Sequence, residues 1–440
     1  MSCAAADARS AKNVFSKTFD VTYSVEMADS TDGIFDEAVQ WVRQNWDPDM
    51  TVGQWWERLF EASYSLPSLP VNAYGRGYAR ADEQAVWRAF AEVGALGPPV
   101  GIATMMAAPT IAQHATEAQI EGFVPPILLG RQAWCQLFSE PGAGSDLAGL
   151  TTKAVRDGDE WVITGQKVWT SLAREADLGM LLARTDPGAP KHAGITWFAF
   201  EMRQSGVEIR PLTEMTGRAM FNEVFIDEAT VADDAMIGEP GEGWAVGNTT
   251  LMFERASLAG SMVNLPYARS GSGAGELDVR AGDSSSREDG RGGARPRDVS
   301  ITSWYLDAAR SVGRETEVLR DELVKDHITA EVNRLTGQRA RTGEVKAIGN
   351  LGKLAMSQIA RSQREVGNLA IGAAGMLDGA DAAAGPGGGD VQRQTISSPA
   401  PAIYGGTDQV QRNIIGERVL GLPKEPGPAK TTPFKDLPSN

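Results

Sequence analysis

The hydrophobic positions change their period twice along the chain. Between residues 33 and 131, large apolar side chains recur at steps of three and four residues, which predicts amphipathic helices. Residues 116–119 have the sequence Thr-Glu-Ala-Gln, a capping-box pattern that predicts the start of one helix, and Pro125-Pro126 predicts its end. Because apolar stripes of this kind are most often core faces, we interpret this region as a helical domain.

From residue 133 to about residue 241 the apolar period becomes two. Short apolar runs, such as residues 195–200, alternate with Asp-Gly, Asp-Pro-Gly and Ser-Gly turns. This spacing is typical of a β-sandwich or barrel. Residues 221–226 are predicted to be its last strand, so a β domain is expected between two helical regions.

The helical period returns after Gly243 and continues to the end of the chain with one long interruption. Residues 270–298 contain mainly Gly, Ser, Arg, Asp and Glu, with almost no large apolar side chain. Such a segment buries too little surface to offset its ordering entropy, so we expect a flexible insertion. The last helix is predicted to follow Thr407 as its N-cap and to end at Gly421.

Composition excludes several classes of protein. The 440 residues carry 42 basic and 57 acidic side chains, a net charge of −15, so no basic stripe is present that could bind nucleic acid. The two cysteines, Cys3 and Cys135, suit a reducing compartment, and the three histidines form no cluster with metal-site spacing. We find no secretory signal and no apolar run long enough to span a bilayer, and therefore expect a cytoplasmic protein.

One stretch, residues 134–146, carries an unusual turn. Its apolar run stops at Glu140-Pro141, and small residues then lead to a Ser-Asp pair. Gly142 and Gly144 allow the backbone to approach a bulky group closely, and the free N–H groups of such a loop suit an anionic ligand. On these residues alone, a tight β-turn explains the pattern equally well.

Two further stretches change that interpretation. Residues 161–171 (Trp-Val-Ile-Thr-Gly-Gln-Lys-Val-Trp-Thr-Ser) and 404–412 (Tyr-Gly-Gly-Thr-Asp-Gln-Val-Gln-Arg), taken with the first stretch, resemble the acyl-CoA dehydrogenase family over about residues 38–426. The resemblance implies an α+β fold with an N-terminal helical domain, a middle β barrel or sandwich and a C-terminal four-helix bundle. It also implies FAD between the β domain and the bundle, and a tetramer built from dimers.

With this fold, the chain divides at the points where its pattern changes. The expected parts are a loose tail at 1–26, the N-terminal helical domain at 27–132, the middle β domain at 133–242, the bundle at 243–425 with its insertion at 270–298, and a tail at 426–440.

The same resemblance assigns cofactor and substrate contacts. Side chains expected against the flavin ring are Phe138, Ser139, Trp169 and Ser171, with Trp169 as an apolar wall and the hydroxyls on polar edges. Ser145 matches a hydroxyl that contacts cofactor phosphate near the thioester. Thr407 and Gln409 match positions at the adenosine-diphosphate half of FAD, where a helix start favours phosphate. Tyr404 and Gly405 are expected on the substrate side.

The position of the catalytic base differs among members of the family. The family's reaction removes the α-proton of an acyl thioester, and a carboxylate in a dry site, with its pKa raised by desolvation, is the usual base. In many members that Glu follows the Tyr of the C-terminal motif, but here the position is Gly405. Isovaleryl-CoA dehydrogenase instead has Glu before Arg on a bundle helix, which Glu254 and Arg255 match. We expect Glu254 as base and Arg255 as a supporting charge; the alternative is that Glu254 only pairs with Arg255 or another charge.

The leading hypothesis is an FAD-dependent acyl-CoA dehydrogenase that makes a trans-2-enoyl-CoA and passes electrons to an electron-transfer flavoprotein. The Arg-x-x-Phe-Gly motif, which in many members reaches the FAD of a neighbouring subunit, is absent. The chain is therefore either a homo-oligomer or one subunit of a heterotetramer, as in relatives acting on bulky or steroid-side-chain CoA thioesters. Rival hypotheses are a flavin oxidase or monooxygenase of the same fold and a non-catalytic subunit.

Overall fold

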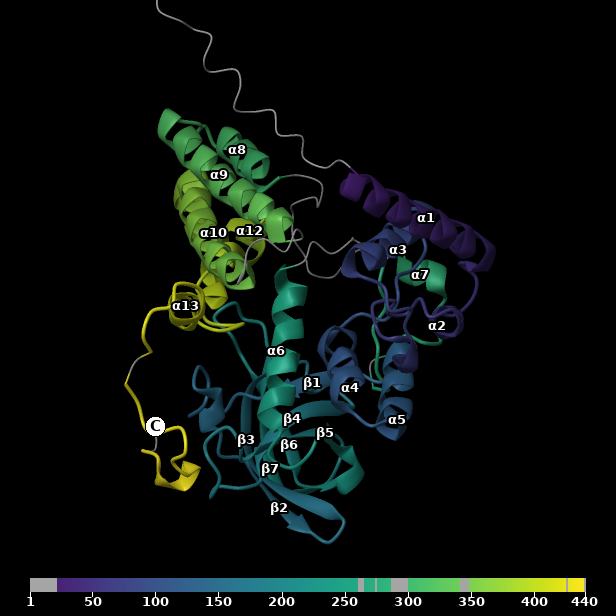
Figure 1. Ribbon diagram of the computed structural model, residues 1–440. Coiled ribbons are helices and arrows are strands. Elements are labelled where there is room, and N and C mark those ends of the chain that lie inside the picture. Colours follow the sequence, from purple (N-terminus) through teal and green to yellow (C-terminus); the bar gives the residue numbers. More distant parts are fainter. Residues whose placement is uncertain are drawn as a thin grey trace, which may run out of the picture.

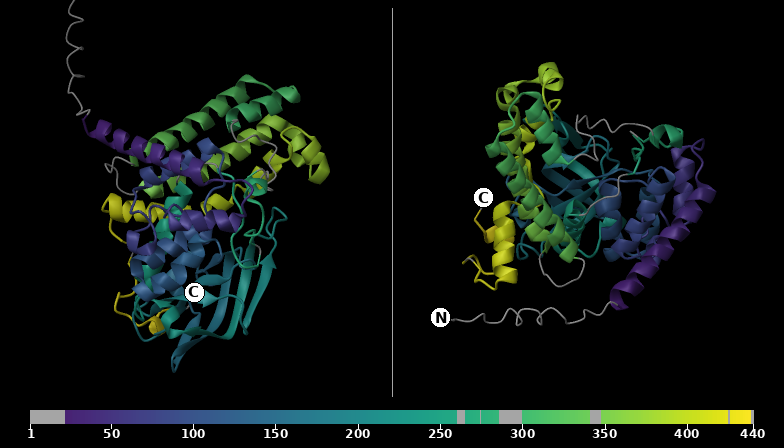
Figure 2. Two further views of the ribbon diagram at one scale, coloured as in Figure 1. Left: turned by 90° about the vertical axis from the view of Figure 1, so that its right-hand side faces the viewer. Right: turned by 90° about the horizontal axis from the view of Figure 1, so that it is seen from above.

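A computed structural model describes residues 22–259, 265–273, 275–285, 300–340, 348–424 and 426–438. Two helical regions lie on opposite flanks of a central helix, α6 (Gly243–Ala259), with a β sheet at its foot (Figures 1 and 2). None of the helices in these ranges is both long enough and apolar enough to cross a membrane.

The N-terminal region is helical, as predicted. Its elements are α1 (Thr22–Asn45), α2 (Val52–Glu61), the 3-10 turn η1 (Val71–Ala73), α3 (Arg80–Val93), the π-helical turn η2 (Ala103–Ala107), α4 (Ala108–His114) and α5 (Glu117–Leu128). Trp55 and Trp56 of α2 are fully buried, and their indole N–H groups donate to the carbonyls of Leu96 and Gly97 at 2.7 and 3.0 Å. Because both indoles keep a hydrogen-bond partner, these large rings can occupy the core without an unsatisfied donor.

Two predicted boundaries in this region are wrong. Residues 22–26, expected in the loose tail, belong to α1, whereas residues 1–21 lie outside the described residues. Thr116 forms the predicted capping box of α5, but Pro125 and Pro126 lie inside this helix, which continues to Leu128. The carbonyls deprived of donors by the prolines belong to the exposed residues 121 and 122, where water can replace the missing N–H groups.

The middle region forms the predicted β domain. Its strands are β1 (Trp134–Leu137), β2 (Lys153–Asp157), β3 (Glu160–Ser171), β4 (Leu178–Arg184), β5 (Ile195–Glu201), β6 (Val207–Leu212), β7 (Phe221–Ala232) and β8 (Met236–Ile237). Their order is β6-β7-β3-β2-β4-β5-β8, and β1 pairs in parallel with β4. The predicted last strand is thus longer than expected, and the short β8 follows it.

The sheet is divided at the junction of β2 and β4, which share only the pair Lys153 and Arg184. Its two halves pack across a common apolar layer that includes Trp161 of β3 and Phe198 of β5. The opposite face of β4 and β5 packs against α4, α5 and α6. The strand β1, which is paired with β4, contributes Cys135 and Leu137 to the first layer and Trp134 to the second.

Part of the predicted flexible insertion is packed. The carbonyls of Val279 and Leu277 accept hydrogen bonds at 2.8 Å from the first two N–H groups of α2, and Ala281 begins a short helix, α7 (Ala281–Ser285). The prediction is wrong here because the apolar residues 277, 279 and 281 alternate with polar ones and fill the edge of the N-terminal core. Residues 274 and 286–298 of the predicted insertion lie outside the described residues.

The C-terminal region is helical, as predicted. After α6 it contains α8 (Ile301–Ser311), α9 (Glu317–Ala340), α10 (Ile348–Ile371), the 3-10 turn η5 (Gly372–Met376), α11 (Gly379–Ala384), α12 (Asp390–Ser397), α13 (Asp408–Ile414) and the π-helical turn η7 (Ile415–Val419). Side chains of α8, α9, α10 and α12 share one core, which includes Tyr305, Leu323 and Val366.

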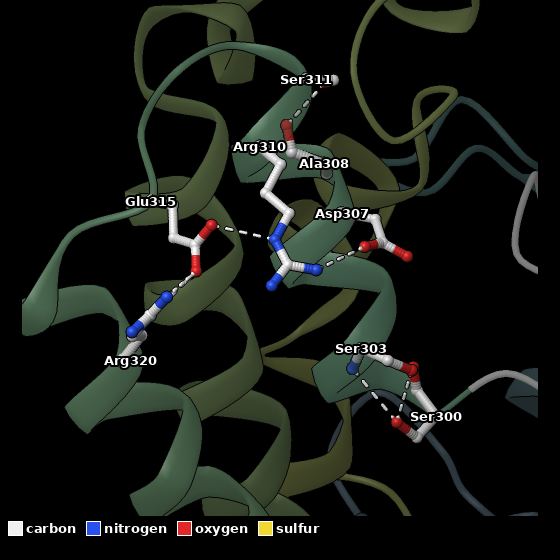
Figure 3. Close-up of polar contacts among 8 residues, drawn as sticks. All are labelled: Ser300, Ser303, Asp307, Ala308, Arg310, Ser311, Glu315 and Arg320. Atoms are coloured by element: carbon white, nitrogen blue, oxygen red, sulfur yellow. Dashed lines mark hydrogen bonds and ion pairs between the residues drawn. The ribbon is translucent and has the colours of Figure 1, made fainter.

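A chain of exposed charges joins α8 to α9 (Figure 3). Arg310 donates to Glu315 at 2.9 Å and to Asp307 at 3.3 Å, and Arg320 of α9 also pairs with Glu315. Hydrogen bonds from Arg310 and Arg320 lower the pKa of Glu315 to about 2. This network fixes the short connection between the two helices at the surface.

Candidate active site

The end of β1 meets the end of β3 in the centre of the β domain. The backbone N–H of Val168 donates to the carbonyl of Ser139 at 2.9 Å. This bond places Phe138 and Ser139 beside the segment that carries Trp169 and Ser171. The structure therefore brings together the four residues that were expected against the flavin ring.

Trp169 has an unusual conformation. Its φ is +62°, its side chain is 61% exposed, and its ring lies edge-on to Phe221 with 6.1 Å between ring centroids. A bulky residue in the left-handed region is strained, and such strain often accompanies function. An exposed indole held in this way can form one wall of a ligand site.

The loop that follows Ser139 is held by its own backbone hydrogen bonds, and its outer side is not covered by other protein atoms. Glu140 and Ala143 exchange two backbone hydrogen bonds at 3.0 Å, which makes the predicted tight turn. A Cβ atom added to Gly142 or Gly144 would meet no protein atom within 4 Å. The neighbouring Ser145 is exposed. Protein packing does not require these glycines, so the space above the loop is free for a ligand to approach the backbone.

A buried ion pair, which the sequence reasoning missed, supports this loop. Lys167 is 0% exposed and donates to Glu140 Oε1 at 2.8 Å and to the Phe138 carbonyl at 3.1 Å. Glu140 also accepts hydrogen bonds from the N–H groups of Thr151 and Thr152 at 2.7 and 2.9 Å. Burial alone would raise the pKa of Glu140, but the charge and hydrogen bond of Lys167 and the threonine donors lower it to about 2.

One signal in the sequence could have revealed this pair. Lys167 lies on β3 at the same parity as Trp161 and Ile163, whose side chains are buried. A lysine at an inward-facing strand position requires a buried partner, since burying an unpaired charge is costly.

Glu254 lies on α6, and this helix extends from the sheet toward the helices of the bundle (Figure 1). Its side chain is only partly exposed, and burial raises the pKa of its carboxyl. The amide of Gln136 on β1 and the charge of Arg255 oppose this rise. Gln136 Nε2 is buried and has no hydrogen-bond partner. No hydrogen bond of ordinary length therefore joins this amide to the carboxyl of Glu254. The structure therefore has a buried donor near Glu254 that no protein acceptor among the described residues satisfies.

Arg255 does not hold Glu254 in a close ion pair. Its Nε donates to the carbonyl of Leu251 in the same helix at 2.8 Å, and no ion pair within 4 Å joins it to Glu254 in the described ranges. Burial lowers the pKa of Arg255, and the charge of Glu254 opposes this effect while that of Arg418 adds to it. The interpretation of Glu254 as half of a structural pair with Arg255 therefore has no support in the geometry.

The third candidate group lies at the start of α13. Gly405 and Gly406 have φ values of +63° and +84°, and Gln411 Nε2 donates to the Gly405 carbonyl at 3.1 Å. The Thr407 hydroxyl accepts from the N–H of Val410 at 3.2 Å, which confirms Thr407 as the N-cap. The left-handed backbone explains glycine at position 405, since a glutamate there would be strained.

Two other residues expected in this group are exposed. Tyr404 is 42% exposed, and burial of the rest of its side chain raises its pKa, while Gln409 is exposed on α13. The sequence reasoning missed Asp408, which is buried and pairs with Arg361 of α10 at 2.6 Å. This ion pair anchors the start of α13 to the bundle, so Thr407 and Gln409 stand on the bundle side of α6 rather than on the sheet.

Comparisons with known proteins show the family of the chain. The acyl-CoA dehydrogenase N-terminal domain model matches residues 24–131, and the acyl-CoA dehydrogenase middle domain model matches residues 135–229. The chain is 36% identical over 382 residues to the acyl-CoA dehydrogenase IpdE1 of Mycobacterium tuberculosis, covering 84% of this chain and 88% of that protein. The chain belongs to the acyl-CoA dehydrogenase family.

Other relatives of this acyl-CoA dehydrogenase match a part of the chain more strongly or share its fold. The acyl-CoA dehydrogenase FadE34 of M. tuberculosis is 49% identical over 201 residues, which are 46% of this chain and 28% of FadE34. A solved structure described as the Tcur3481-Tcur3483 steroid ACAD has a TM-score of 0.65 at 24% identity, covering 90% of this chain and 98% of its own. The ChsE4-ChsE5 complex from M. tuberculosis has a TM-score of 0.63 at 24% identity, covering 90% and 98%. These structures show the fold.

Membership in the family makes the protein a flavin-dependent oxidoreductase and implies FAD as its cofactor. The residues present fit such a group. The loop around Gly142 is open, the indole of Trp169 is exposed beside Ser139, and the amide of Gln136 has an unused buried donor. A planar ring with polar edges requires an apolar wall and a few placed donors of this kind.

Proposed function

We propose that this acyl-CoA dehydrogenase desaturates an acyl-CoA thioester between its α and β carbons, with Glu254 as the base. The observation that carries this proposal is a partly buried carboxyl with a raised pKa on the helix that faces β1. Position 405, where many relatives carry their base, holds a glycine in a left-handed turn. Glu254 is thus the remaining family position at which a base would act.

The chemistry suits a desolvated carboxylate. Glu254 takes the α-proton of the thioester, and its raised pKa brings it closer to the acidity of the carbon that loses the proton. Bound FAD supplies the acceptor for the β-hydrogen and its electron pair. Arg255 keeps a positive charge next to Glu254 and so limits how far burial raises the pKa of that carboxyl. The Gln136 amide would orient either the carboxyl or the thioester.

The remaining site residues are proposed to bind and orient. Phe138, Ser139, Trp169 and Ser171 would hold the flavin ring, Ser145, Thr407 and Gln409 its phosphates, and Tyr404 and Gly405 would line the thioester side. Ser145 would also lie near the thioester. These roles follow from the resemblance to the family. Phe138 and Ser139 come directly after β1, Trp169 and Ser171 lie on β3, and Thr407 caps α13.

The test is the variant Glu254→Gln, which keeps the shape of the side chain and removes the base. We expect flavin reduction by CoA thioesters under anaerobic conditions to fall by at least about 10³-fold, while the flavin spectrum and FAD content are unchanged. The exposed Glu92 of α3 provides the matched control, Glu92→Gln, which should reduce flavin at the wild-type rate. Turnover retained in Glu254→Gln would exclude it as the base.

The pH profile provides a second check. Because burial raises the pKa of Glu254, the acidic limb of kcat/KM should lie above the ordinary range of a glutamate. A limb at the ordinary value would show that the carboxyl is solvated in the working enzyme. That result would contradict the dry site on which the assignment of Glu254 depends.

We further propose that the chain works as an oligomer, in either a homo-oligomer or a heterotetramer with a second acyl-CoA dehydrogenase subunit. Three observations support it. The Arg-x-x-Phe-Gly motif is absent from the sequence. One face of α9 exposes Val324, Ile328, Val332 and Leu335, a stripe at helical spacing. The similar solved structures include a ChsE4-ChsE5 complex. Light scattering of the chain alone and of co-expressed subunit pairs separates the two assemblies, because a homo-oligomer forms from this chain alone, whereas the heterotetramer forms only with the second subunit.

The electron acceptor and the acyl group belong to the same proposal. We propose an electron-transfer flavoprotein as acceptor and a bulky, steroid-side-chain type of thioester in lipid catabolism, since a similar solved structure is described as a steroid ACAD. The rival oxidase reading has one supporting observation, a TM-score of 0.58 to the prolyl acyl carrier protein oxidase AnaB. Oxygen consumption measured beside dye-linked turnover decides between them, since a dehydrogenase should use the dye and leave oxygen unconsumed.

A further inference from the structure

The C-terminal segment leaves the bundle and returns to the β domain. Residues 426–438 lie along the flank of the molecule, beyond α13 (Figure 1), and contact the loop between β4 and β5. The backbone N–H groups of Phe434 and Lys435 donate to carbonyls of the β4–β5 loop, residues 185–194, at 2.9 and 3.0 Å. We call residues 431–437 the strap.

The ring of Phe434 covers a buried cation. The guanidinium carbon of Arg184 lies 3.5 Å from the centroid of this ring. Arg184 is the last residue of β4 and only 4% exposed, and burial lowers its pKa to about 10 while the charge of Glu140 opposes this effect. A guanidinium removed from water interacts favourably with an aromatic face. Phe434 therefore covers the guanidinium and helps to hold Arg184 in place.

Arg184 in turn holds the loop that carries Ser145. Its Nη2 and Nε atoms donate to the carbonyls of Ala148 and Leu150 at 2.7 and 3.1 Å, and its Nη1 atom donates to the carbonyl of Lys191 at 3.0 Å. Each nitrogen of the guanidinium has a backbone acceptor. The planar fork therefore connects the segment after Ser145 to the β4–β5 loop in one defined geometry.

A second contact joins the β4–β5 loop to the segment that carries Ser145. The ammonium of Lys191, in the β4–β5 loop, pairs with the carboxylate of Asp146 at 2.5 Å. The strap thus contacts the β4–β5 loop through its backbone and Arg184 through its ring. Both contacts lead to residues 145–150.

We propose that Phe434 is a positioning residue, which acts through Arg184 to set the conformation of residues 145–150 around the cofactor and thioester. This inference rests on the proposed function, because it takes Ser145 to be a ligand contact. The strap follows α13, where Thr407 and Gln409 are proposed to contact the other half of the same cofactor. One continuous segment therefore joins the two sides of the site.

The first test is hydrogen exchange of the full-length chain without ligand. In Phe434→Ala, the amides of residues 146–152 should exchange about tenfold faster than in the wild type, because the guanidinium loses its aromatic cover. Phe434→Tyr keeps the ring and should exchange like the wild type. Lys435→Ala is the matched control, since this neighbouring side chain is exposed, and amides of α2 report whether the whole chain has loosened.

Some exchange results would overturn the proposal. Unchanged exchange at 146–152 in Phe434→Ala would remove the strap from the support of the loop. Equal acceleration in Lys435→Ala, or equal acceleration in α2, would show a general effect of the terminus rather than the ring contact.

The second test is the dissociation constant of FAD, measured by flavin fluorescence. We expect an increase of about three- to tenfold in Phe434→Ala and no change in Phe434→Tyr or Lys435→Ala. An unchanged constant in Phe434→Ala would overturn the positioning role even if exchange had increased. If the wild type bound no FAD in any assembly, the proposed function would fail, whereas the exchange data would still report on the contact between strap and loop.

Discussion

Two glutamates in this molecule have pKa values lowered to about 2, and they reach that value in opposite surroundings. Glu140 is 6% exposed and paired with the fully buried Lys167 beneath the candidate site. Glu315 lies at the surface between Arg310 and Arg320, where α8 meets α9 (Figure 3). The same titration behaviour therefore accompanies two different structural roles.

The difference lies in what happens when one partner is removed. At the surface, water replaces a lost partner at little cost, so exposed ion pairs contribute little to stability. In the interior, the remaining charge has no solvent and becomes strongly destabilising. The pair also supports the position of Phe138 and Ser139. Lys167 donates to the Phe138 carbonyl, and Glu140, which follows Ser139, accepts from the N–H of Thr152. The buried pair is thus part of the site, whereas the exposed network only connects two helices.

The largest effect should come from breaking the buried pair. Lys167→Met leaves Glu140 as an unpaired carboxylate in the interior, and we expect the free energy of unfolding to fall by about 3–5 kcal/mol. Urea unfolding of the purified chain measures this change. FAD affinity should fall with it, since the Phe138 carbonyl also loses its donor.

A double variant separates the charge from the packing. Glu140→Gln combined with Lys167→Met removes both charges, and should recover part of the stability lost in Lys167→Met alone. If the double variant were instead destabilised by the sum of the effects measured for Lys167→Met and Glu140→Gln alone, the pair would make no coupled contribution to stability. The buried charges would then be independent of each other.

The larger pattern of the fold could be predicted from the sequence. The switch from a helical period to a period of two and back located the sheet between two helical regions, since burial of one face leaves this signal in each element. Thr116 and Thr407 were recognised as caps because a capping residue acts on N–H groups only two or three positions away. Local signals of this kind survive without knowledge of the tertiary structure.

Interactions between distant segments could not be predicted in this way. Lys167 and Glu140 are 27 positions apart, and Phe434 meets Arg184 from the far end of the chain. Residues 277–281 lie in a polar stretch, and their packing partner, the start of α2, is distant in the sequence. The sequence around them therefore does not indicate that they pack. For Glu254 the family motif indicated the position, but its raised pKa depends on the folding of α6 near β1. Each of these contacts depends on which distant segments of the chain meet in the fold.

The pH dependence of stability should distinguish the wild type, which has the buried pair, from a variant that lacks it. A glutamate with a lowered pKa stabilises the fold above its unfolded pKa of about 4.5, and this contribution is lost as the pH falls toward its folded value. For Glu140 the difference amounts to about 3 kcal/mol between pH 5 and pH 2. The urea midpoint of the wild type should therefore fall more steeply over this range than that of the double variant Glu140→Gln/Lys167→Met. Parallel slopes would contradict the low pKa of Glu140.

The smallest effect should come from the exposed network. Arg320→Ala removes one of the two partners of Glu315, and the remaining Arg310 and water can solvate the carboxylate. We expect a slight decrease in the thermal midpoint at low ionic strength, and none in about 1 M salt, where charges are screened within a few ångströms. The buried pair is shielded from ions, so the loss in Lys167→Met should persist in the same salt. If salt abolished the effects of both Arg320→Ala and Lys167→Met, the environments of Glu140 and Glu315 would differ less than their burial indicates. Only the backbone contacts of Lys167 would then distinguish the buried pair from the exposed network.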